Sequence, residues 1–267
     1  MNSTAADSYS KGLAGVIAGK SSISTVGLKG TGLTYRGYAI EDLCSQCTFE
    51  EVAYLLLFKE LPTRTQLHSF QDTIAANRAL PVPLRTVLEQ LPRDAHPMDV
   101  LRTGCSTLGT FEPETHPNEQ QVNIAIRLIS CYASMLFYWY HFSHFGKRID
   151  TGTSKKDSVA EHFLHLLHDD PKKIDPLCAR TVDASLILYA EHDFNASTFA
   201  ARVTCATLSD FYSCITSAIG TLRGPLHGGA NEAAMHMLEG FKDEMDARQQ
   251  LEQMFARKEL VMGFGHR

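Results

Sequence analysis

The sequence predicts a mainly all-α protein, with a large multi-helical domain, a small β-hairpin near the N-terminus, and the start of a smaller helical domain. Residues 21–38 are rich in Thr, Val, Ile and Tyr around the turn sequence Gly30-Thr31-Gly32, which is typical of a hairpin. Beyond residue 48, apolar residues recur at helical spacing, and helix-start signals appear twice. Strands are therefore expected only near the N-terminus.

The first two strong helices are marked by their start signals. In "TFEEVAYLLLFKELP", Thr48 stands three residues before Glu51, and Pro62 closes the pattern. "TRTQLHSFQDTIAANRALP" repeats the spacing with Thr63 and Gln66. A Thr hydroxyl can accept from the amide three residues on while the Glu or Gln reaches back, so helices should begin after each Thr.

Longer helical patterns follow. "HPMDVLRTGCSTLG" predicts a short helix, and residues 118–145 predict one long helix that is apolar around much of its circumference and hence buried. "SVAEHFLHLLHDDP" is amphipathic. "DPLCARTVDASLILYAEH" and "STFAARVTCATLSDFYSCITSAIG" are each expected to form one helix. Gly and Pro in "LRGPLHGGAN" interrupt the pattern, so we expect a large domain over residues 1–223 and a smaller one beginning over 224–267.

Composition excludes several function classes. The chain has 267 residues, of which 44% are hydrophobic, and a formal net charge of −5. Without long basic runs, nucleic acid is not an expected partner. No apolar run approaches the roughly 18–20 residues that span a bilayer, so no membrane partner is expected. The polar start "MNSTAADSYSKG" lacks the apolar core of a signal peptide.

The cysteines indicate a reducing compartment. There are seven, an odd number without framework spacing, which fits free thiols and a cytoplasmic location. Cys44 and Cys47 have no second pair to complete a zinc site, so they are interpreted as structural.

One candidate site lies in "GPLHGGANEAAMHMLEGF". Pro225 disfavours helix before it, Gly228 and Gly229 leave space, and Asn231 is the expected N-cap of the helix that follows. His227 would then precede a helix N-terminus, where the helix dipole disfavours a cation and a neutral imidazole can donate to a developing oxyanion. Triosephosphate isomerase uses a neutral histidine at a helix N-terminus in this way. The alternative is a glycine-rich turn with an incidental histidine.

A second candidate lies in "LYAEHDFNASTFAAR". His192 is expected to end one helix and Asn195 to cap the next. The backbone N–H groups of residues 196–198 would then form an anion seat beside His192. The alternative is an ordinary corner between two helices.

The third candidate is "VMGFGHR". Gly263 and Gly265 would let a ligand approach the backbone, and His266 follows, although the pattern is no dinucleotide fingerprint. Other histidines recur three apart, a spacing that can also hold metal: His141 and His144, and His162, His165 and His168. Without an H-E-x-x-H pattern, half-buried boundary histidines are the favoured interpretation, and a metalloprotein is the alternative.

Taken together, "LYAEHDFNASTFAAR", "RGPLHGGANEA" and "MGFGHR" strongly resemble the citrate synthase family. The resemblance extends over residues 12–267 and is supported by "YRGYAIEDL", "FEEVAYLLLFKELPT" and "HPMDVLRTG". "YWYHFSHFGKRI" is more typical of the 2-methylcitrate synthase branch.

The resemblance implies a helical homodimer whose smaller domain closes over its ligands. The reaction would condense oxaloacetate with an acyl-CoA, propionyl-CoA in the methylcitrate branch, and hydrolyse the thioester. Coenzyme A is then a co-substrate, with no tightly bound cofactor and no metal. By motif, His227 would hydrogen-bond the thioester oxygen, His266 would polarise the oxaloacetate ketone, and His192 and Asn195 would bind oxaloacetate. The loop contacting coenzyme A would comprise Val261, Met262, Gly263, Phe264 and Gly265.

The sequence departs from the family pattern in two ways. The family's general-base aspartate and most substrate-binding arginines lie beyond the "GFGH" loop, so we expect residues 1–267 to be an N-terminal portion that does not turn over alone. Asp193 stands where the family more often has Glu. The alternatives are citrate synthase acting on acetyl-CoA, a non-catalytic fragment that folds and binds ligand weakly, and the metalloprotein.

Overall fold

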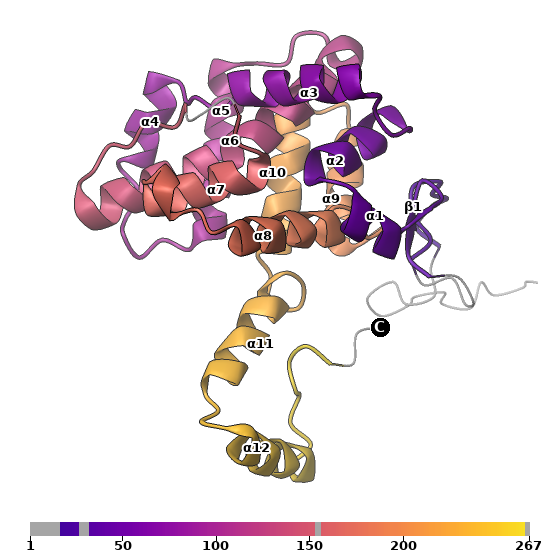
Figure 1. Cartoon of the computed structure of the whole chain (residues 1–267), viewed down its shortest axis with the longest axis vertical. Helices are drawn as coiled ribbons and strands as arrows, with labels where there is room; N and C mark the ends of the chain where they lie inside the picture. The colour runs from indigo at the N-terminus through magenta and orange to yellow at the C-terminus, as the bar shows by residue number, and fades with distance from the viewer. Residues whose placement is uncertain (1–16, 27–31, 153–155, 265–267) are drawn as a thin grey trace, which may run out of the picture.

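The computed structural model describes residues 17–26, 32–152 and 156–264. Ten helices of this part, α1 to α10, form a packed body, and α11 and α12 project from it (Figure 1). The mainly α-helical fold with a two-stranded sheet confirms the prediction. The body elements are β1 (Thr34–Tyr35), β2 (Tyr38–Ala39), α1 (Ile40–Gln46), α2 (Phe49–Phe58), α3 (Arg64–Ala76), α4 (Val82–Leu88), α5 (Pro97–Phe111), α6 (Pro117–Phe145), α7 (Val159–His168), the 3₁₀ turn η2 (Pro171–Lys173), α8 (Pro176–Tyr189), α9 (Ala196–Cys205) and α10 (Phe211–Leu222). The projecting helices are α11 (Gly229–Glu239) and α12 (Glu244–Ala256).

The hairpin turns at a position that sequence analysis did not single out. Strands β1 and β2 pair antiparallel around Arg36 and Gly37, which have φ values of 49° and 91°. Glycine adopts such a left-handed conformation without steric cost. Ser24 pairs with Tyr35 and extends this region. The turn expected at residues 30–32 falls largely outside the described residues, because Gly30 and Thr31 are not among them.

Both capping boxes form as predicted. Thr48 accepts from the amide of Glu51 and Thr63 from the amide of Gln66, while each partner side chain bonds back to the Thr amide. The long helix is also confirmed, because α6 runs without a break from Pro117 to Phe145.

The segment expected as one helix after residue 196 is two. Helix α9 ends at Cys205, Leu208 takes a left-handed φ of 63°, and α10 begins after Asp210. The Asp210 side chain accepts from the amide of Ser213 at 2.9 Å and so caps the new helix. A short carboxylate competes well for free amides at a helix start, and this cap outweighs the helical tendency of the flanking Ala-rich sequence.

Helix α6 forms the centre of the body. It packs against helices on several sides, and Leu128, Cys131, Met135 and Tyr138 are almost completely buried in the largest apolar cluster. By length and composition alone α6 could cross a membrane, so the expectation that no segment reaches this threshold is wrong. More than half of its most apolar window is buried by other helices, which is how a core helix behaves.

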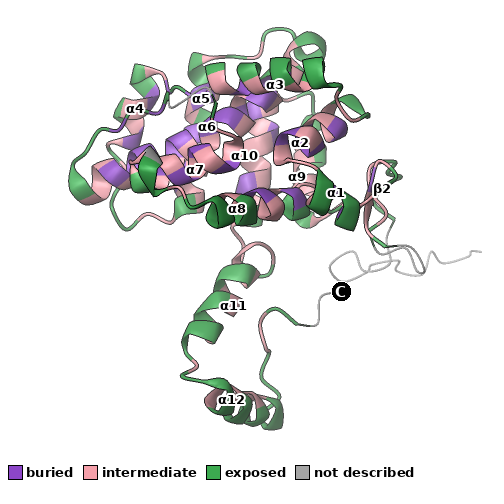
Figure 2. Cartoon of the chain, in the orientation of Figure 1, coloured by how far each residue is buried: buried purple, intermediate pink, exposed green. Residues whose placement is uncertain are grey.

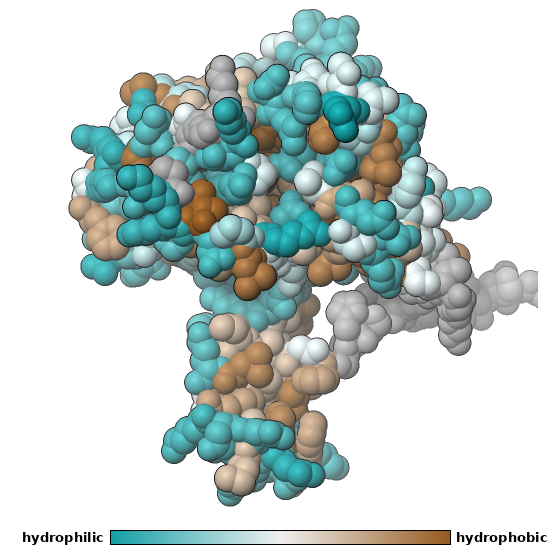
Figure 3. All heavy atoms as spheres, viewed as in Figure 1, coloured by the Kyte–Doolittle hydropathy of each residue, from teal (hydrophilic) through white to brown (hydrophobic). Residues whose placement is uncertain are grey.

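The projecting helices have little core of their own. No residue of α11 or α12 is buried, and Figure 2 shows them in exposed and intermediate colours only. Hydrophobic side chains gather on this projecting part in Figure 3; those largely exposed include Met235, Leu238, Met245 and Phe255. The direction of α11 therefore depends on contacts at its start.

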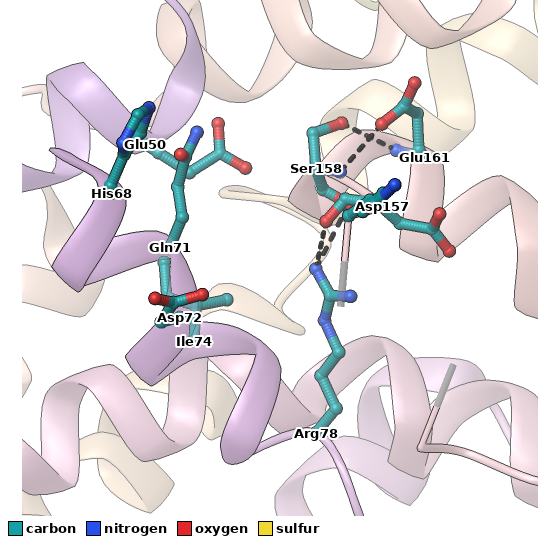
Figure 4. Close-up of a pocket in the computed structure, with 10 residues that line it drawn as sticks. Glu50, His68, Gln71, Asp72, Ile74, Arg78, Asp157, Ser158 and Glu161 are labelled. Carbon is teal, nitrogen blue, oxygen red and sulfur yellow. Dashed lines mark hydrogen bonds between the residues drawn. The ribbon is translucent and has the colours of Figure 1, made fainter. Parts of the chain in front are cut away.

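A polar cavity of about 530 Å³ lies between α2, α3 and the start of α7 (Figure 4). Glu50 is 2% exposed, and its Oε1 accepts from the amide of Val159 at 2.7 Å. Arg78, also buried, donates from Nη2 to the carbonyl oxygen of Asp157 at 2.6 Å. Burial raises the pKa of Glu50. These contacts hold the start of α7 in place, and no lining residue belongs to the three histidine motifs.

One buried histidine makes the stability of the body pH-dependent. His162 on α7 is 2% exposed, and its Nε2 lies 3.2 Å from the hydroxyl of Ser134. Burial, with the nearby Arg78 charge, lowers the pKa of His162 to about 3. Between its ordinary value of 6.5 and about 3, the unfolded chain binds a proton that the folded chain does not.

Stability should therefore be complete above pH 6.5 and fall with acidification. We predict that this group removes about 2 kcal/mol of unfolding free energy between about pH 7 and about pH 5. Urea denaturation across this range should show a shallower pH slope for His162→Gln than for the wild type. His68→Gln, at an exposed position, should keep the wild-type slope; an unchanged slope in His162→Gln contradicts the assignment.

Candidate active site

Asn195 caps α9 as the sequence predicted. Its Oδ1 accepts from the amide of Thr198 at 3.0 Å and from the hydroxyl of Ser197 at 2.6 Å. The amides of Ala196 and Ser197 and the Nδ2 group of Asn195 have no partner among the described residues. A helix start with spare donors is suited to an anion.

A serine connects this helix start to His227. The Nε2 atom of His227 lies 3.0 Å from the hydroxyl oxygen of Ser197. The Ser197 hydroxyl has one hydrogen and donates it in the bond to Asn195. The Ser197 oxygen must therefore accept the hydrogen bond from His227, so His227 Nε2 carries a hydrogen in this arrangement. Asn195, Ser197 and His227 thus form one hydrogen-bonded row that joins the second motif to the first.

The turn that carries His227 is built from glycines. The amides of His227 and Gly229 both donate to the carbonyl oxygen of Gly224, at 3.0 and 3.1 Å. A Cβ atom on Gly228 would lie 2.4 Å from the carbonyl oxygen of Leu222, a backbone atom that cannot move aside cheaply. Gly228 is therefore required by the chain's own backbone.

Helix α11 begins at Gly229, so His227 lies in the turn just before a helix start, as expected. The predicted N-cap at Asn231 is wrong, because this residue lies in the first turn. The carbonyl oxygens of His227 and Gly228 accept from the amides of Ala230 and Asn231, at 3.1 and 3.2 Å, and the backbone thus replaces a side-chain cap. The Asn231 amide group instead donates to the hydroxyl of Tyr189, the last residue of α8.

His192 lies close to the α9 start, but it does not end a helix. Helix α8 stops at Tyr189, three residues earlier, and His192 is exposed with its Nε2 donating to the carbonyl oxygen of Leu188 at 3.0 Å. Asp193 follows with a left-handed φ of 57°. Asp is enriched among the non-glycine residues that take this conformation, so the departure from Glu suits the local backbone.

The third motif is only partly described. Gly265 and His266 lie outside the described residues. Before them, the amide of Phe264 donates to the carbonyl oxygen of Val261 at 3.3 Å, and Gly263 has φ 89°. A Cβ atom on Gly263 would lie 3.5 Å from Ala234, so this tight turn, which also includes Met262, lies against α11.

Two of the histidines spaced three apart make structural contacts. His141 Nε2 donates to the carbonyl oxygen of Leu166 at 2.8 Å, and His165 Nδ1 lies 3.0 Å from Asp157. Among the described residues, no three His, Cys, Asp or Glu side chains converge as metal ligands would.

The described cysteines are free thiols. Burial raises the pKa of both Cys44 and Cys47. Neither has the lowered pKa that marks a reactive cysteine.

Sequence reasoning missed two residues at the junction of these motifs, Ser197 and Tyr189. The signal for Ser197 was its place two residues after a helix cap, where a hydroxyl can reach the cap side chain. Tyr189 offered no local signal, because its partner Asn231 is 42 residues away.

Comparison with known proteins identifies the family of the chain. A sequence model of the family described as citrate synthase, C-terminal domain, matches residues 12–267. The 2-methylcitrate synthase of Shewanella oneidensis is 56% identical over 255 residues, which cover 96% of this chain and 67% of that protein. The chain belongs to the citrate synthase family.

Citrate synthases are also similar to the chain in sequence and in structure. The citrate synthase of Mycolicibacterium smegmatis is 41% identical and covers 96% of this chain and 68% of its own length. A citrate synthase from the archaeon Thermoplasma acidophilum, solved with carboxymethyl coenzyme A and oxaloacetate, superimposes with a TM-score of 0.87 at 30% identity. That match covers 97% of this chain and 68% of that one. These relatives are acyl-CoA condensing transferases, and this chain is an enzyme of that class.

The glycine turn provides a test of how His227 is placed. Gly228→Ala should displace the turn, because its Cβ would meet a backbone oxygen, and the variant should lose at least about 2 kcal/mol of unfolding free energy. Gly220→Ala in α10 is the control, since its Cβ would meet only Arg102 at an ordinary 3.7 Å. Urea denaturation of both variants is the measurement, and equal stabilities would contradict the proposed constraint.

Proposed function

We propose that this enzyme condenses propionyl-CoA with oxaloacetate and, with water, releases 2-methylcitrate and coenzyme A. The observation that supports this most is the row of Asn195, Ser197 and His227, which joins an anion-suited helix start to a histidine with a fixed proton partner. The high identity to a 2-methylcitrate synthase favours propionyl-CoA as the thioester.

The chemistry requires a donor at the thioester oxygen. The α-proton of a thioester is only weakly acidic, so a base alone does not remove it near neutral pH. A preorganised hydrogen-bond donor that meets the developing enolate oxygen can contribute roughly 3–4 kcal/mol. We assign this role to His227, whose neutral imidazole donates without becoming a cation.

Ser197 controls which ring nitrogen of His227 donates. While the Ser197 hydroxyl points to Asn195, His227 presents its Nε2–H to the serine oxygen. If the hydroxyl turns toward Nε2, a neutral ring carries its proton on Nδ1, and Nδ1 can then donate to the thioester oxygen. Rotation of the Ser197 hydroxyl therefore accompanies the change of His227 to the Nδ1–H tautomer, which is the form that donates to the thioester oxygen.

Oxaloacetate would bind at the start of α9. The spare amides of Ala196 and Ser197 and the Asn195 Nδ2 group are donors for a carboxylate, and exposed His192 stands beside them. His266 is assigned by family resemblance to polarise the ketone, so that its carbon accepts the enolate.

The turn from Val261 to Gly265 is proposed to contact coenzyme A. Its described part lies against Ala234 of α11, the helix that follows His227. Exposed main chain beside this helix offers hydrogen-bonding groups to a pantetheine amide. In this proposal residues 1–223 form the large domain, and residues 224–267 belong to the smaller one.

We further propose a homodimer and a cytoplasmic location. Large apolar side chains stand exposed on α8 and α9 and in the corner after α9, including Leu177, Val203 and Leu208. Exposed apolar residues on these two consecutive helices are suited to contact with a second copy of the chain.

The second candidate is citrate synthase activity with acetyl-CoA. It is favoured by the similarity to relatives that are named citrate synthase and not 2-methylcitrate synthase, among them the Mycolicibacterium smegmatis protein. The two thioesters differ by one methylene group, which is worth only about 1–3 kcal/mol in a binding pocket.

The substrate assignment predicts a preference for the longer thioester. In a protein that includes the family's general-base region, we expect kcat/KM for propionyl-CoA to exceed that for acetyl-CoA by at least about tenfold, the effect of one well-packed methylene. Release of the coenzyme A thiol with oxaloacetate present measures both values. A tenfold preference for acetyl-CoA would assign the second candidate. Oxaloacetate calorimetry is the companion measurement, and a silent titration argues against the proposed anion site.

The serine contact predicts a selective loss. In the same longer protein, Ser197→Ala removes the Ser197 hydroxyl that contacts His227 Nε2 and should lower kcat on the order of tenfold, the value of about one hydrogen bond. The KM for oxaloacetate should change less, because the Asn195 cap to Thr198 remains. Ser106→Ala, an exposed serine on α5, is the matched control. An unchanged kcat in Ser197→Ala would show that the contact does not serve the reaction.

A further inference from the structure

The start of α11 is attached to the body through polar side chains. His227 contacts Ser197 at the start of α9, and Asn231 contacts Tyr189 at the end of α8. A third contact reaches a different helix, because His96 Nε2 lies 3.1 Å from Glu232 Oε2. Since α11 buries no residue, such contacts decide where it points.

The two ring nitrogens of His96 contact two different helices. It precedes α5, and its Nδ1 accepts from the amide of Met98 at 3.1 Å, so that nitrogen carries the lone pair. The proton of the neutral ring is then on Nε2, the atom that faces Glu232. One imidazole therefore caps α5 and donates to α11, and the cap fixes the tautomer that the second contact needs.

Glu232 lies in the first turn of α11, where a carboxylate is favoured by the helix dipole. Its hydrogen bond to His96 is the main cause that lowers the pKa of Glu232 below its usual range. Its other oxygen lies 3.9 Å from His236 on the same helix. Glu232 is thus directed from α11 toward the start of α5, whereas the other two contacts reach α8 and α9.

We propose that His96 is a positioning residue that, through Glu232, sets the direction in which α11 leaves the body and so orients the small-domain start relative to His227. This inference rests on the proposed function, since it assigns His96 to the same reaction. The contact at the start of α5 adds a third point of attachment to those at α8 and α9, and three contacts to three different helices define an orientation.

The alternative is that His96 serves only as a cap for α5. Two substitutions separate the roles, because an Asn oxygen can replace Nδ1 and a Gln nitrogen can replace Nε2. His96→Asn keeps the cap and removes the donor to Glu232. His96→Gln keeps the donor and weakens the cap. Glu232→Ala removes the acceptor and leaves the cap untouched.

Hydrogen exchange of the full chain tests the attachment directly. In His96→Asn and in Glu232→Ala, the amides of residues 231–235 should exchange faster by on the order of two- to fivefold, as expected for an exposed polar contact. His96→Gln should stay at the wild-type rate. The double variant His96→Asn/Glu232→Ala should exchange no faster than either single variant. Unchanged exchange in His96→Asn, or additive effects in the double variant, would overturn the proposal.

Kinetics test whether the attachment serves the reaction. The kcat/KM for propionyl-CoA should fall by a similar factor in His96→Asn and Glu232→Ala and recover in His96→Gln. Faster exchange with unchanged kinetics would overturn the positioning role. These kinetics are measured on a protein that includes the family's general-base region, because residues 1–267 are not expected to turn over alone. Absence of condensing activity in that longer wild-type protein would count against the proposed function alone, because the exchange comparison decides the attachment without catalysis.

Discussion

The hydrogen bond between Ser197 and His227 is the contact on which the proposed site depends. It joins two segments that are 30 residues apart, the cap of α9 and the glycine turn before α11. The bond can form only because each side is fixed independently. Asn195 accepts a hydrogen bond from the Ser197 hydroxyl and so orients the lone pairs of the hydroxyl oxygen toward the His227 ring. On the other side, Gly228 lets the turn pass so close to the Leu222 carbonyl oxygen that a Cβ atom would lie only 2.4 Å from it.

The packing of the body positions the two sides of this contact. Helix α6 organises the main apolar cluster, and α10 packs closely against α5, with Gly109 against the Tyr212 side chain. A rigid α10 delivers the turn at its end to a defined place. Helix α11 instead leaves the body through polar contacts, and none of its residues is buried.

Local signals in the sequence predicted much of the fold. Capping boxes at Thr48 and Thr63 and the long apolar helix α6 could be located because each depends on residues within a few positions. The division between α9 and α10 depended on one aspartate cap inside an otherwise helical pattern. The start of α11 was misplaced because backbone carbonyls, not Asn231, cap it. Family motifs indicated His192, Asn195 and His227, but Ser197 and His96 became visible only through partners distant in sequence.

The most direct test of His227 as a neutral donor is to measure the protonation state of its ring when ligands occupy both the oxaloacetate site and the coenzyme A site. Nitrogen NMR of a histidine-labelled protein can follow the ring with oxaloacetate and carboxymethyl coenzyme A, the pair seen with the archaeal citrate synthase. A neutral ring whose proton moves from Nε2 to Nδ1 on binding is the expected result. A charged imidazolium, or a proton that stays on Nε2 in the filled site, would contradict His227 as the neutral donor to the thioester oxygen.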